Sequence, residues 1–165
     1  MKNVILMRYD RCLGCRSCEL ACAAAHSNAG SVIGAKMAGE KPVNRIFVSQ
    51  AGGKKMPLNC RHCEDAPCID ACITGAMHRE PTGAVINEGG ASRCTGCWMC
   101  VMVCPYGVIR SDLVQRRAVK CDRACLDEGG TPACVRSCPT GALVLAPVEE
   151  FSGARRKEFL IRSIG

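Results

Sequence analysis

The run Cys94-Thr-Gly-Cys97-Trp-Met-Cys100-Val-Met-Val-Cys104-Pro105 has the spacing Cys-x2-Cys-x2-Cys-x3-Cys-Pro. Three cysteines of such a run wrap three irons of one [4Fe–4S] cubane on a tight loop, while the fourth points toward another cluster. A glycine at Gly96 lets the backbone turn closely around inorganic sulfide. The run therefore predicts clusters that are held in pairs, with each run serving two of them.

The other cysteines extend this pattern, because all sixteen fall into four groups of four with none left over. The first group repeats the spacing of the quoted run, the second has a wider x4 gap, and the fourth is the loosest. Four cubanes need sixteen ligands, so four [4Fe–4S] clusters are expected. The groups are Cys12, Cys15, Cys18 and Cys22 (group one); Cys60, Cys63, Cys68 and Cys72 (group two); Cys94, Cys97, Cys100 and Cys104 (group three); and Cys121, Cys125, Cys134 and Cys138 (group four).

Two other uses of many cysteines compete with clusters. Zinc ribbons also use four cysteines, but they place two Cys-x2-Cys knuckles well apart, whereas groups one and three each fit four cysteines into a short run. A disulfide framework belongs to oxidising compartments, and the N-terminus has only about four consecutive apolar residues, too few for a secretory signal. We therefore expect a cytoplasmic cluster protein, with a zinc-binding interaction module as a remote alternative.

The formal net charge of +7 at first indicates an acidic partner. Each oxidised cluster with four thiolates carries a charge of about −2, so four clusters would bring the loaded protein close to neutrality. Without a basic stripe interleaved with aromatic residues, no nucleic-acid binding is expected. No apolar run approaches the roughly 18 residues of a membrane span, and no triad, Walker A loop or dinucleotide fingerprint predicts catalysis.

Three groups end in the same short repeat, in which the closing cysteine is followed by a glycine turn and an apolar stretch. The copies are Cys72–Met77, Cys104–Ile109 and Cys138–Leu143. We expect the glycine to redirect the chain into a β-strand, with Gly83–Asn87 as a return strand after the first copy. Group one differs, because Ala23–Ala25 favours a continued helix.

The segments outside the groups carry weaker signals. Residues 27–44 are rich in Gly, Ser and Lys and predict a loop or docking insertion, followed by a strand at Arg45–Ser49. Gly52–Lys55 predicts a turn. The tail from Glu149 to Ile164 predicts a helix that packs on the body, with a partner-binding arm as the alternative; its acids precede its basic residues, which suits the helix dipole.

The second group resembles a known family. Its run Cys60-Arg-His-Cys63-Glu-Asp-Ala-Pro-Cys68 is similar to that of the four-cluster iron–sulfur subunits of the dimethyl-sulfoxide-reductase type, found with molybdenum and tungsten enzymes, formate dehydrogenases and hydrogenases. The resemblance spans residues 4 to 146. It is strongest to small soluble members, such as the electron carriers of carbon monoxide dehydrogenase and of tungsten aldehyde oxidoreductases.

The resemblance implies a pairing that spacing alone leaves open, with group one beside group four and group two beside group three. It implies an α+β fold of two pseudo-symmetric ferredoxin-like lobes, one inserted in the other: an outer lobe of 1–50 and 105–147, an inner lobe of 51–104, and a C-terminal helix or tail, 148–165. The implied ligand sets are set A, Cys12, Cys15, Cys18 and Cys138; set B, Cys22, Cys121, Cys125 and Cys134; set C, Cys60, Cys63, Cys68 and Cys104; and set D, Cys72, Cys94, Cys97 and Cys100.

Group four departs from the family pattern. Its opening, Cys121-Asp-Arg-Ala-Cys125, is one residue longer than the usual Cys-x2-Cys. The extra residue either bulges from the loop or marks a cluster of altered geometry and potential.

The resemblance also implies a function. We expect a non-catalytic subunit that relays electrons between a catalytic oxidoreductase subunit and a second electron carrier or flavin subunit. The catalytic partner would be a molybdenum or tungsten enzyme, a carbon monoxide dehydrogenase or a hydrogenase, oxidising an aldehyde, carbon monoxide, formate or hydrogen. A free, diffusible polyferredoxin is the alternative.

Residues beside the cysteines have two interpretations each. Trp98, between two expected ligands, would shield a cluster from water or fill the core. Three cations directly precede a group and would raise the potential of a reduced cluster, or would remain solvated and screened. They are Arg11, Arg93 and Lys120.

The three histidines are expected at the surface or at an interface rather than as cluster ligands, because the cysteines already meet the need. They are His26, His62 and His78.

Overall fold

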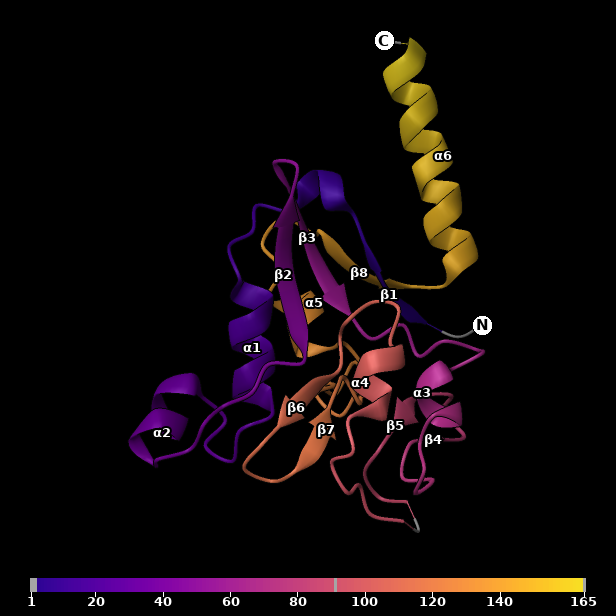
Figure 1. The fold of residues 1–165 in the computed structure, drawn as a ribbon. Helices are drawn as coiled ribbons and strands as arrows, with labels where there is room; N and C mark the ends of the chain where they lie inside the picture. Colours follow the sequence, from indigo (N-terminus) through magenta and orange to yellow (C-terminus); the bar gives the residue numbers. More distant parts are fainter. Residues whose placement is uncertain (1–2, 91, 165) are drawn as a thin grey trace.

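The computed structural model describes residues 3–90 and 92–164, and within them the predicted α+β class is found (Figure 1). The strands form four two-stranded antiparallel sheets, and the helices are short except for the last. In chain order the elements are β1 (Val4–Met7), the 3-10 helix η1 (Tyr9–Arg11), α1 (Ser17–Ala25), α2 (Val32–Met37), β2 (Ile46–Ala51), β3 (Lys54–Asn59), α3 (Pro67–Asp70), β4 (His78–Arg79), β5 (Val85–Ile86), α4 (Met99–Val103), β6 (Arg110–Asp112), β7 (Arg117–Val119), α5 (Ala133–Arg136), β8 (Leu143–Ala146) and α6 (Val148–Ile164).

The sheet β1–β8 joins the two ends of the cysteine-bearing chain. Val4 lies opposite Ala146 and Met7 opposite Leu143, so the strand that precedes group one pairs with the strand that follows group four. The strand predicted after Cys138 is confirmed as β8. Groups one and four are thereby held side by side although most of the chain separates them.

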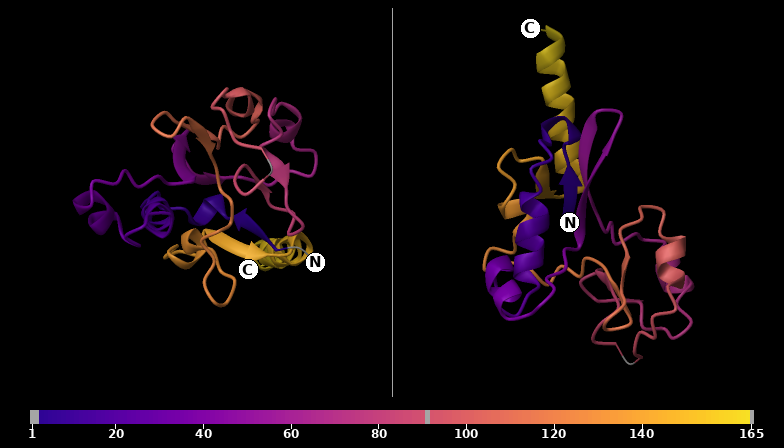
Figure 2. Two further views of the ribbon diagram at one scale, coloured as in Figure 1. Left: turned by 90° about the horizontal axis from the view of Figure 1, so that it is seen from below. Right: turned by 60° about the vertical axis from the view of Figure 1, so that its left-hand side comes forward.

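Two separate clusters of buried side chains form the interior. The first contains Ile5, Ile46 and Leu143 together with cysteines of groups one and four. The second contains Met77, Ile109 and cysteines of groups two and three. Much of both interiors is therefore made of the cysteines themselves, which replace the large aromatic residues that this chain lacks. Figures 1 and 2 show the elements of the second cluster gathered beside those of the first.

The hairpin β2–β3 confirms the strand predicted at 45–49 and the turn predicted at 52–55. Gly52 and Gly53 both have positive φ, at 54° and 76°, in the turn between the strands. The second strand was not expected, because its lysines and Pro57 disfavour a sheet. A proline is tolerated because a two-stranded sheet leaves each strand with a free edge.

The shorter hairpins are built on the repeat after each closing cysteine. β4 pairs with β5, His78 opposite Ile86, which confirms the predicted return strand. β6 follows the second copy and pairs with β7, Ser111 opposite Ala118. Ala118 and Ile109 are buried in the second cluster, with groups two and three. The structure thus packs 109–119 with the expected inner lobe, although the expected boundary assigned it to the outer one.

The helix α1 runs to Ala25, as the three alanines after Cys22 predict. The segment predicted as a loop, 27–44, contains the short helix α2, whose N-cap Ser31 accepts a hydrogen bond at its Oγ from the N–H of Gly34 at 2.9 Å. Serine at this position satisfies a backbone donor that the helix cannot pair internally.

The C-terminal helix α6 is confirmed as a helix, and it extends away from the body in Figure 1. Polar contacts on one flank attach it: Glu158 accepts from Arg8 at 2.8 Å and from Arg11 at 2.6 Å, and Arg155 pairs with Asp10. Its apolar Phe159 is 70% exposed. The predicted packing on the body therefore involves mainly this polar flank. None of the helices in the described residues has the length and apolar character needed to cross a membrane.

Candidate iron–sulfur sites

The loops that open the four cysteine groups share one backbone turn. In each, the residue two positions after the first cysteine has a left-handed conformation. These residues are Gly14 (φ 70°), His62 (φ 48°), Gly96 (φ 71°) and Arg123 (φ 61°). The two glycines signal this turn in the sequence, whereas histidine and arginine there do not, since non-glycine residues seldom adopt positive φ.

The extra residue of group four lies after this turn. Arg123 occupies the left-handed position that Gly14 and Gly96 occupy in their loops, so the added residue is Ala124. Its N–H donates to Oδ1 of Asp122 at 3.1 Å. The loop is therefore lengthened between the turn and Cys125, while its first half keeps the geometry of the others.

Short helices carry the third cysteine of each group. Cys18 lies in α1, Cys68 in α3, Cys100 in α4 and Cys134 in α5. In groups one and three the helix begins directly after a left-handed residue, Arg16 or Trp98, so the two loops follow the same path. The sequence repeat is thus also a structural repeat.

Three hollows in the structure are each lined by four cysteines. One is lined by the cysteines of set A, another by those of set C, and a third by those of set D. Trp98 borders the hollow of set D. Each hollow combines cysteines from two groups that are distant in sequence.

The cysteines of set B also lie together. Burial raises the pKa of the Cys134 thiol, and the nearby thiols of Cys121, Cys125 and Cys22 raise it further. The structure therefore brings together the four cysteines of every set implied by the resemblance. That each set holds a cluster stays a prediction.

The four sets lie in a row. Cys18 of set A acts on the pKa of Cys134 in set B, Cys60 of set C on that of Cys121 in set B, and Cys68 of set C on that of Cys100 in set D. These contacts give the order A, B, C, D. Of the sixteen cysteines only two are exposed, Cys15 in set A and Cys97 in set D.

Backbone N–H groups point at cysteine sulfurs, as expected for a bound anionic cluster. Each sulfur accepts at a distance typical of N–H···S contacts, and such donors stabilise negative charge on iron–sulfur ligands. The donors are Arg45 to Cys22 at 3.2 Å, Met77 to Cys72 at 3.3 Å, His62 to Cys60 at 3.4 Å and Ala118 to Cys94 at 3.5 Å. The donor set and the hollows therefore fit [4Fe–4S] groups.

Burial has opposite consequences for different thiols. It raises the pKa of Cys22 to about 12 and that of Cys100 to about 11, so iron must displace a proton from these buried sulfurs. At Cys72 burial also acts upward, but the N–H of Met77 and the hydroxyl of Thr74 outweigh it and lower the pKa. Within the described residues, no three His, Cys, Asp or Glu side chains converge on one ion position.

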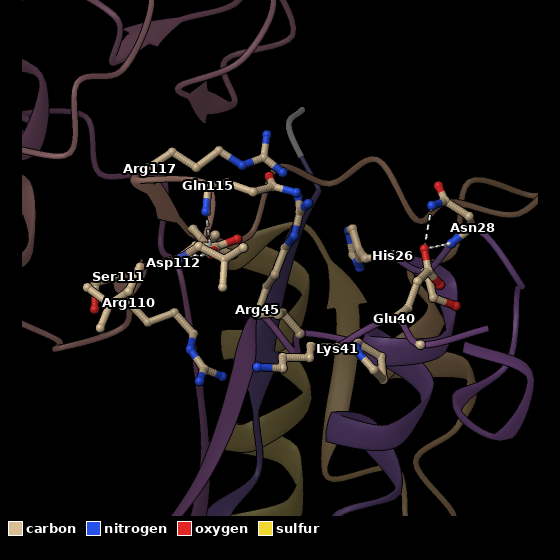
Figure 3. A pocket seen from close by; sticks show the side chains of 17 residues that line it. His26, Asn28, Glu40, Lys41, Arg45, Arg110, Ser111, Asp112, Gln115 and Arg117 are labelled. Carbon is tan, nitrogen blue, oxygen red and sulfur yellow. Dashed lines mark hydrogen bonds between the residues drawn. The ribbon is translucent and has the colours of Figure 1, made fainter. Parts of the chain in front are cut away.

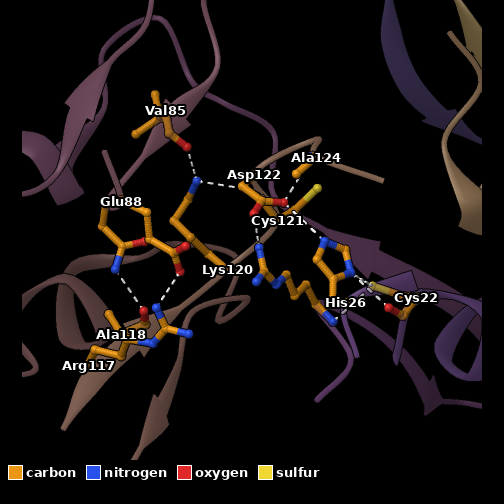
Figure 4. Close-up of polar contacts among 12 residues, drawn as sticks. Cys22, His26, Val85, Glu88, Arg117, Ala118, Lys120, Cys121, Asp122 and Ala124 are labelled. Atoms are coloured by element: carbon orange, nitrogen blue, oxygen red, sulfur yellow. Dashed lines mark hydrogen bonds and ion pairs between the residues drawn. The ribbon is translucent and has the colours of Figure 1, made fainter. Parts of the chain in front are cut away.

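A buried polar network lies beside set B (Figure 4). His26 contacts Asp122 through Nε2, 3.1 Å from Oδ1, and its Nδ1 donates to the carbonyl of Cys22 at 2.8 Å. Arg45 pairs with the second carboxylate oxygen. Burial opposes ionisation of Asp122, but its hydrogen bonds and the Arg45 charge hold its pKa well below the ordinary value.

The surface expectation for the histidines is wrong for His26 and His62. His26 has a side chain only 7% exposed, and His62 is 7% exposed and accepts at Nδ1 from the N–H of Val85 at 2.9 Å. His78 is half-buried, with Nδ1 2.9 Å from the carbonyl of Ala76. Packing across the chain, which the sequence does not reveal, buries the first two.

A groove of about 730 Å³ opens between residues 27–44 and the hairpin β6–β7 (Figure 3). Lys41, Arg45, Arg110 and Arg117 line it, with Asp112 among the acidic residues. Part of this charge is already engaged, since Arg45 pairs with the network beside set B. The groove contains no cysteine and lies outside the four sets.

Comparison with known proteins decides the family. The sequence matches the 4Fe-4S dicluster domain over residues 53–147, more than half of the chain. The chain belongs to the 4Fe-4S dicluster family. A match to the 4Fe-4S binding domain covers residues 9–25, so the two matches of this dicluster protein include all four cysteine groups. Several [4Fe–4S] clusters are thereby confirmed as its cofactors.

Relatives of this dicluster protein carry names that agree. An iron-sulfur protein of Rhodospirillum rubrum is 42% identical over 173 residues, which cover 94% of this chain and 88% of the relative. The electron transport protein HydN of Escherichia coli (strain K12) is 32% identical, covering 95% and 97%. One subunit of the anaerobic dimethyl sulfoxide reductase of the same strain is 34% identical, covering 86% and 71%. The predicted resemblance is confirmed, and with it an electron-transfer role.

Proposed function

We propose that the chain conducts electrons through four [4Fe–4S] clusters bound by sets A, B, C and D, in that order. The observation that carries this proposal is the position of the exposed cysteines: Cys15 belongs to the first set of the row and Cys97 to the last. An electron can thus enter near one and leave near the other. The ligands would be Cys12, Cys15, Cys18 and Cys138; Cys22, Cys121, Cys125 and Cys134; Cys60, Cys63, Cys68 and Cys104; and Cys72, Cys94, Cys97 and Cys100.

The protein's own contribution is to hold and insulate the clusters. When bound, each cluster supplies one-electron redox chemistry. The buried thiols of the middle sets keep water away, while backbone donors such as the N–H groups of Arg45 and Met77 stabilise the charge on sulfur. No residue is needed as an acid, base or nucleophile, so the chain is non-catalytic.

We further propose two ferredoxin-like lobes, one inserted in the other, with boundaries adjusted to the packing. The outer lobe would take β1, α1, the hairpin β2–β3 and the chain after Val119, because these elements surround the first buried cluster. The inner lobe would run from Cys60 to Val119 and surround the second. Each lobe then binds two clusters.

The partners would be a catalytic oxidoreductase subunit at one end and a second electron carrier or flavin subunit at the other, in the cytoplasm. The names of the relatives support a redox partner in general, since one is a subunit of a dimethyl sulfoxide reductase. The proposed catalytic partner is a molybdenum or tungsten enzyme, a carbon monoxide dehydrogenase or a hydrogenase. Exposure at both ends of the row also suits a free polyferredoxin.

Electron counting tests the conduction proposal. Anaerobic coulometric reduction of the purified chain is expected to take up about four electrons, one for each cubane. Uptake of about two electrons would contradict four clusters, and a colourless protein that contains zinc would contradict clusters altogether. A native gel of the source extract separates the two modes of action: a stable complex with a large oxidoreductase identifies a subunit, and a monomer identifies a free carrier.

A further inference from the structure

Lys120 has the most deeply buried charged side chain among the described residues. It is 2% exposed, and its Nζ donates to the carbonyl of Cys121 at 2.9 Å and to the carbonyl of Val85 (Figure 4). Val85 lies in β5, on the side of set C, whereas Cys121 belongs to set B. The ammonium group therefore lies between the two middle sets of the row.

This ammonium lacks a carboxylate partner within the part of the chain that the structure describes, since none of the ion pairs found there includes Lys120. Two carbonyls satisfy its hydrogen bonds but carry no net charge. A buried charge is costly unless an opposite charge compensates it. The required anion must come from another group near Lys120.

The cysteines on both sides are the nearest anionic candidates. The charge of Lys120 acts downward on the pKa of Cys121 in set B, against a larger upward effect of burial. It acts in the same direction on Cys68 in set C, where burial again dominates. Lys120 therefore faces thiols of both middle sets, and a cubane with four thiolates carries about two negative charges in each of them.

We propose that the Lys120 ammonium is the shared counter-charge of the two middle clusters and raises the reduction potential of both. This proposal rests on the proposed function, because it requires clusters in sets B and C. Reduction adds one negative charge to a cluster, and a buried cation nearby favours that state because little water screens it. Lys120 is a positioning residue that sets potentials and touches no substrate.

The chain contains a matched control for this effect. Arg93 precedes Cys94 as Lys120 precedes Cys121, but Arg93 is exposed. Arg11, which precedes Cys12, has a side chain 43% exposed and is paired with Glu158. An exposed cation is screened by water and salt, so only Lys120 of the three is expected to act strongly.

The test is a redox titration of the four clusters, followed by electron paramagnetic resonance, in K120Q, K120M, K120R and R93Q. Cys12→Ser and Cys94→Ser assign the signals of the two terminal clusters. In K120Q and K120M the equilibrium constant for reduction of both middle clusters is expected to fall at least tenfold, which is a lowering of about 59 mV for a one-electron couple. The terminal clusters should change less than threefold, and K120R and R93Q should do so at all four.

Unchanged potentials of the middle clusters in a K120Q protein with full iron content would overturn the proposal. K120Q keeps an N–H donor for the two carbonyls, so it separates charge from hydrogen bonding if K120M fails to assemble. Independently, unmodified reduced protein labelled with 15N-lysine should show electron spin echo modulation from a lysine nitrogen that is lost in K120R, and its absence overturns the proposal. Absence of clusters from the unmodified protein would instead refute the proposed function.

Discussion

Arg45 and Cys22 are joined by a hydrogen bond from the backbone N–H of the first to Sγ of the second, at 3.2 Å. The same arginine uses its guanidinium to pair with Asp122, in the loop of group four. One residue thus connects the last cysteine of group one to the group with which it would share a cluster. The start of β2 is in this way tied to both halves of set B.

Asp122→Ala is expected to destabilise the protein, because it leaves the side chains of Arg45 and His26 buried without their anion. Breaking a buried ion pair costs about 3–5 kcal/mol, and in a chain of this size that corresponds to a lowering of the thermal transition by roughly 6–12 °C. The transition is followed by loss of the cluster absorbance under anaerobic conditions.

Asp127→Ala is the control for this prediction. Asp127 pairs with Arg136, whose side chain is 56% exposed, and exposed pairs contribute at most about 1 kcal/mol. A lowering of less than about 3 °C is expected. Equal effects of the two substitutions would contradict a special role for the network beside set B.

Gly96→Ala is expected to disturb set D more than its loss of a single hydrogen suggests. A Cβ at Gly96 would lie 2.5 Å from the carbonyl oxygen of Arg116, and φ is already positive there. Gly89 has a similar φ with nothing within 4 Å of such a Cβ, so Gly89→Ala reports the cost of the conformation alone, about 1 kcal/mol.

The measurement is again the thermal transition, together with the iron content of each variant. Gly96→Ala should lower the transition by at least about 4 °C more than Gly89→Ala, since a backbone clash adds about 1–3 kcal/mol. Two variants with the same transition temperature would show that the loop of group three is free to shift away from Arg116.

Glu158→Ala is expected to loosen α6 without weakening the body. Glu158 accepts from Arg8 and Arg11 and is one of the few contacts that attach the helix. Limited trypsin cleavage at Arg155–Lys157 should accelerate several-fold, because proteolysis follows local opening, while the cluster absorbance stays unchanged. Glu149→Ala, on the same helix, is the control and should cleave at the unmodified rate.

The sequence predicts the parts of this fold that depend on local pattern. The four cysteine groups, the strands that follow Cys72, Cys104 and Cys138, the helix that continues past Cys22 and the helical tail all arise from spacing or propensity. The strand β3 was missed because lysines and Pro57 oppose it, and only pairing with β2 forms it.

Features that depend on packing between distant segments were beyond the sequence. His62 and Arg123 give no hint of their left-handed turns, and Lys120 resembles Arg93 until the structure shows that only Lys120 is buried. The row of sets likewise appears only when Cys18, Cys134 and the others are seen together. The sequence indicates which residues serve the clusters, and packing determines their neighbours and their order.

Ligand exchange between groups gives a separate prediction. Cys22→Ser should damage the cluster of set B, built mainly by group four, and leave that of set A intact, although Cys22 belongs to group one in sequence. Cys12→Ser should do the reverse. Mössbauer and electron paramagnetic resonance spectra of the two variants distinguish these outcomes, and damage to set A by Cys22→Ser would contradict the pairing.

Iron and acid-labile sulfide analysis of the anaerobically purified chain tests the central claim most directly. Four cubanes predict about sixteen iron and about sixteen sulfide per chain. About eight of each would mean that only one lobe binds clusters, and a protein with zinc and no sulfide would contradict the row of four clusters altogether.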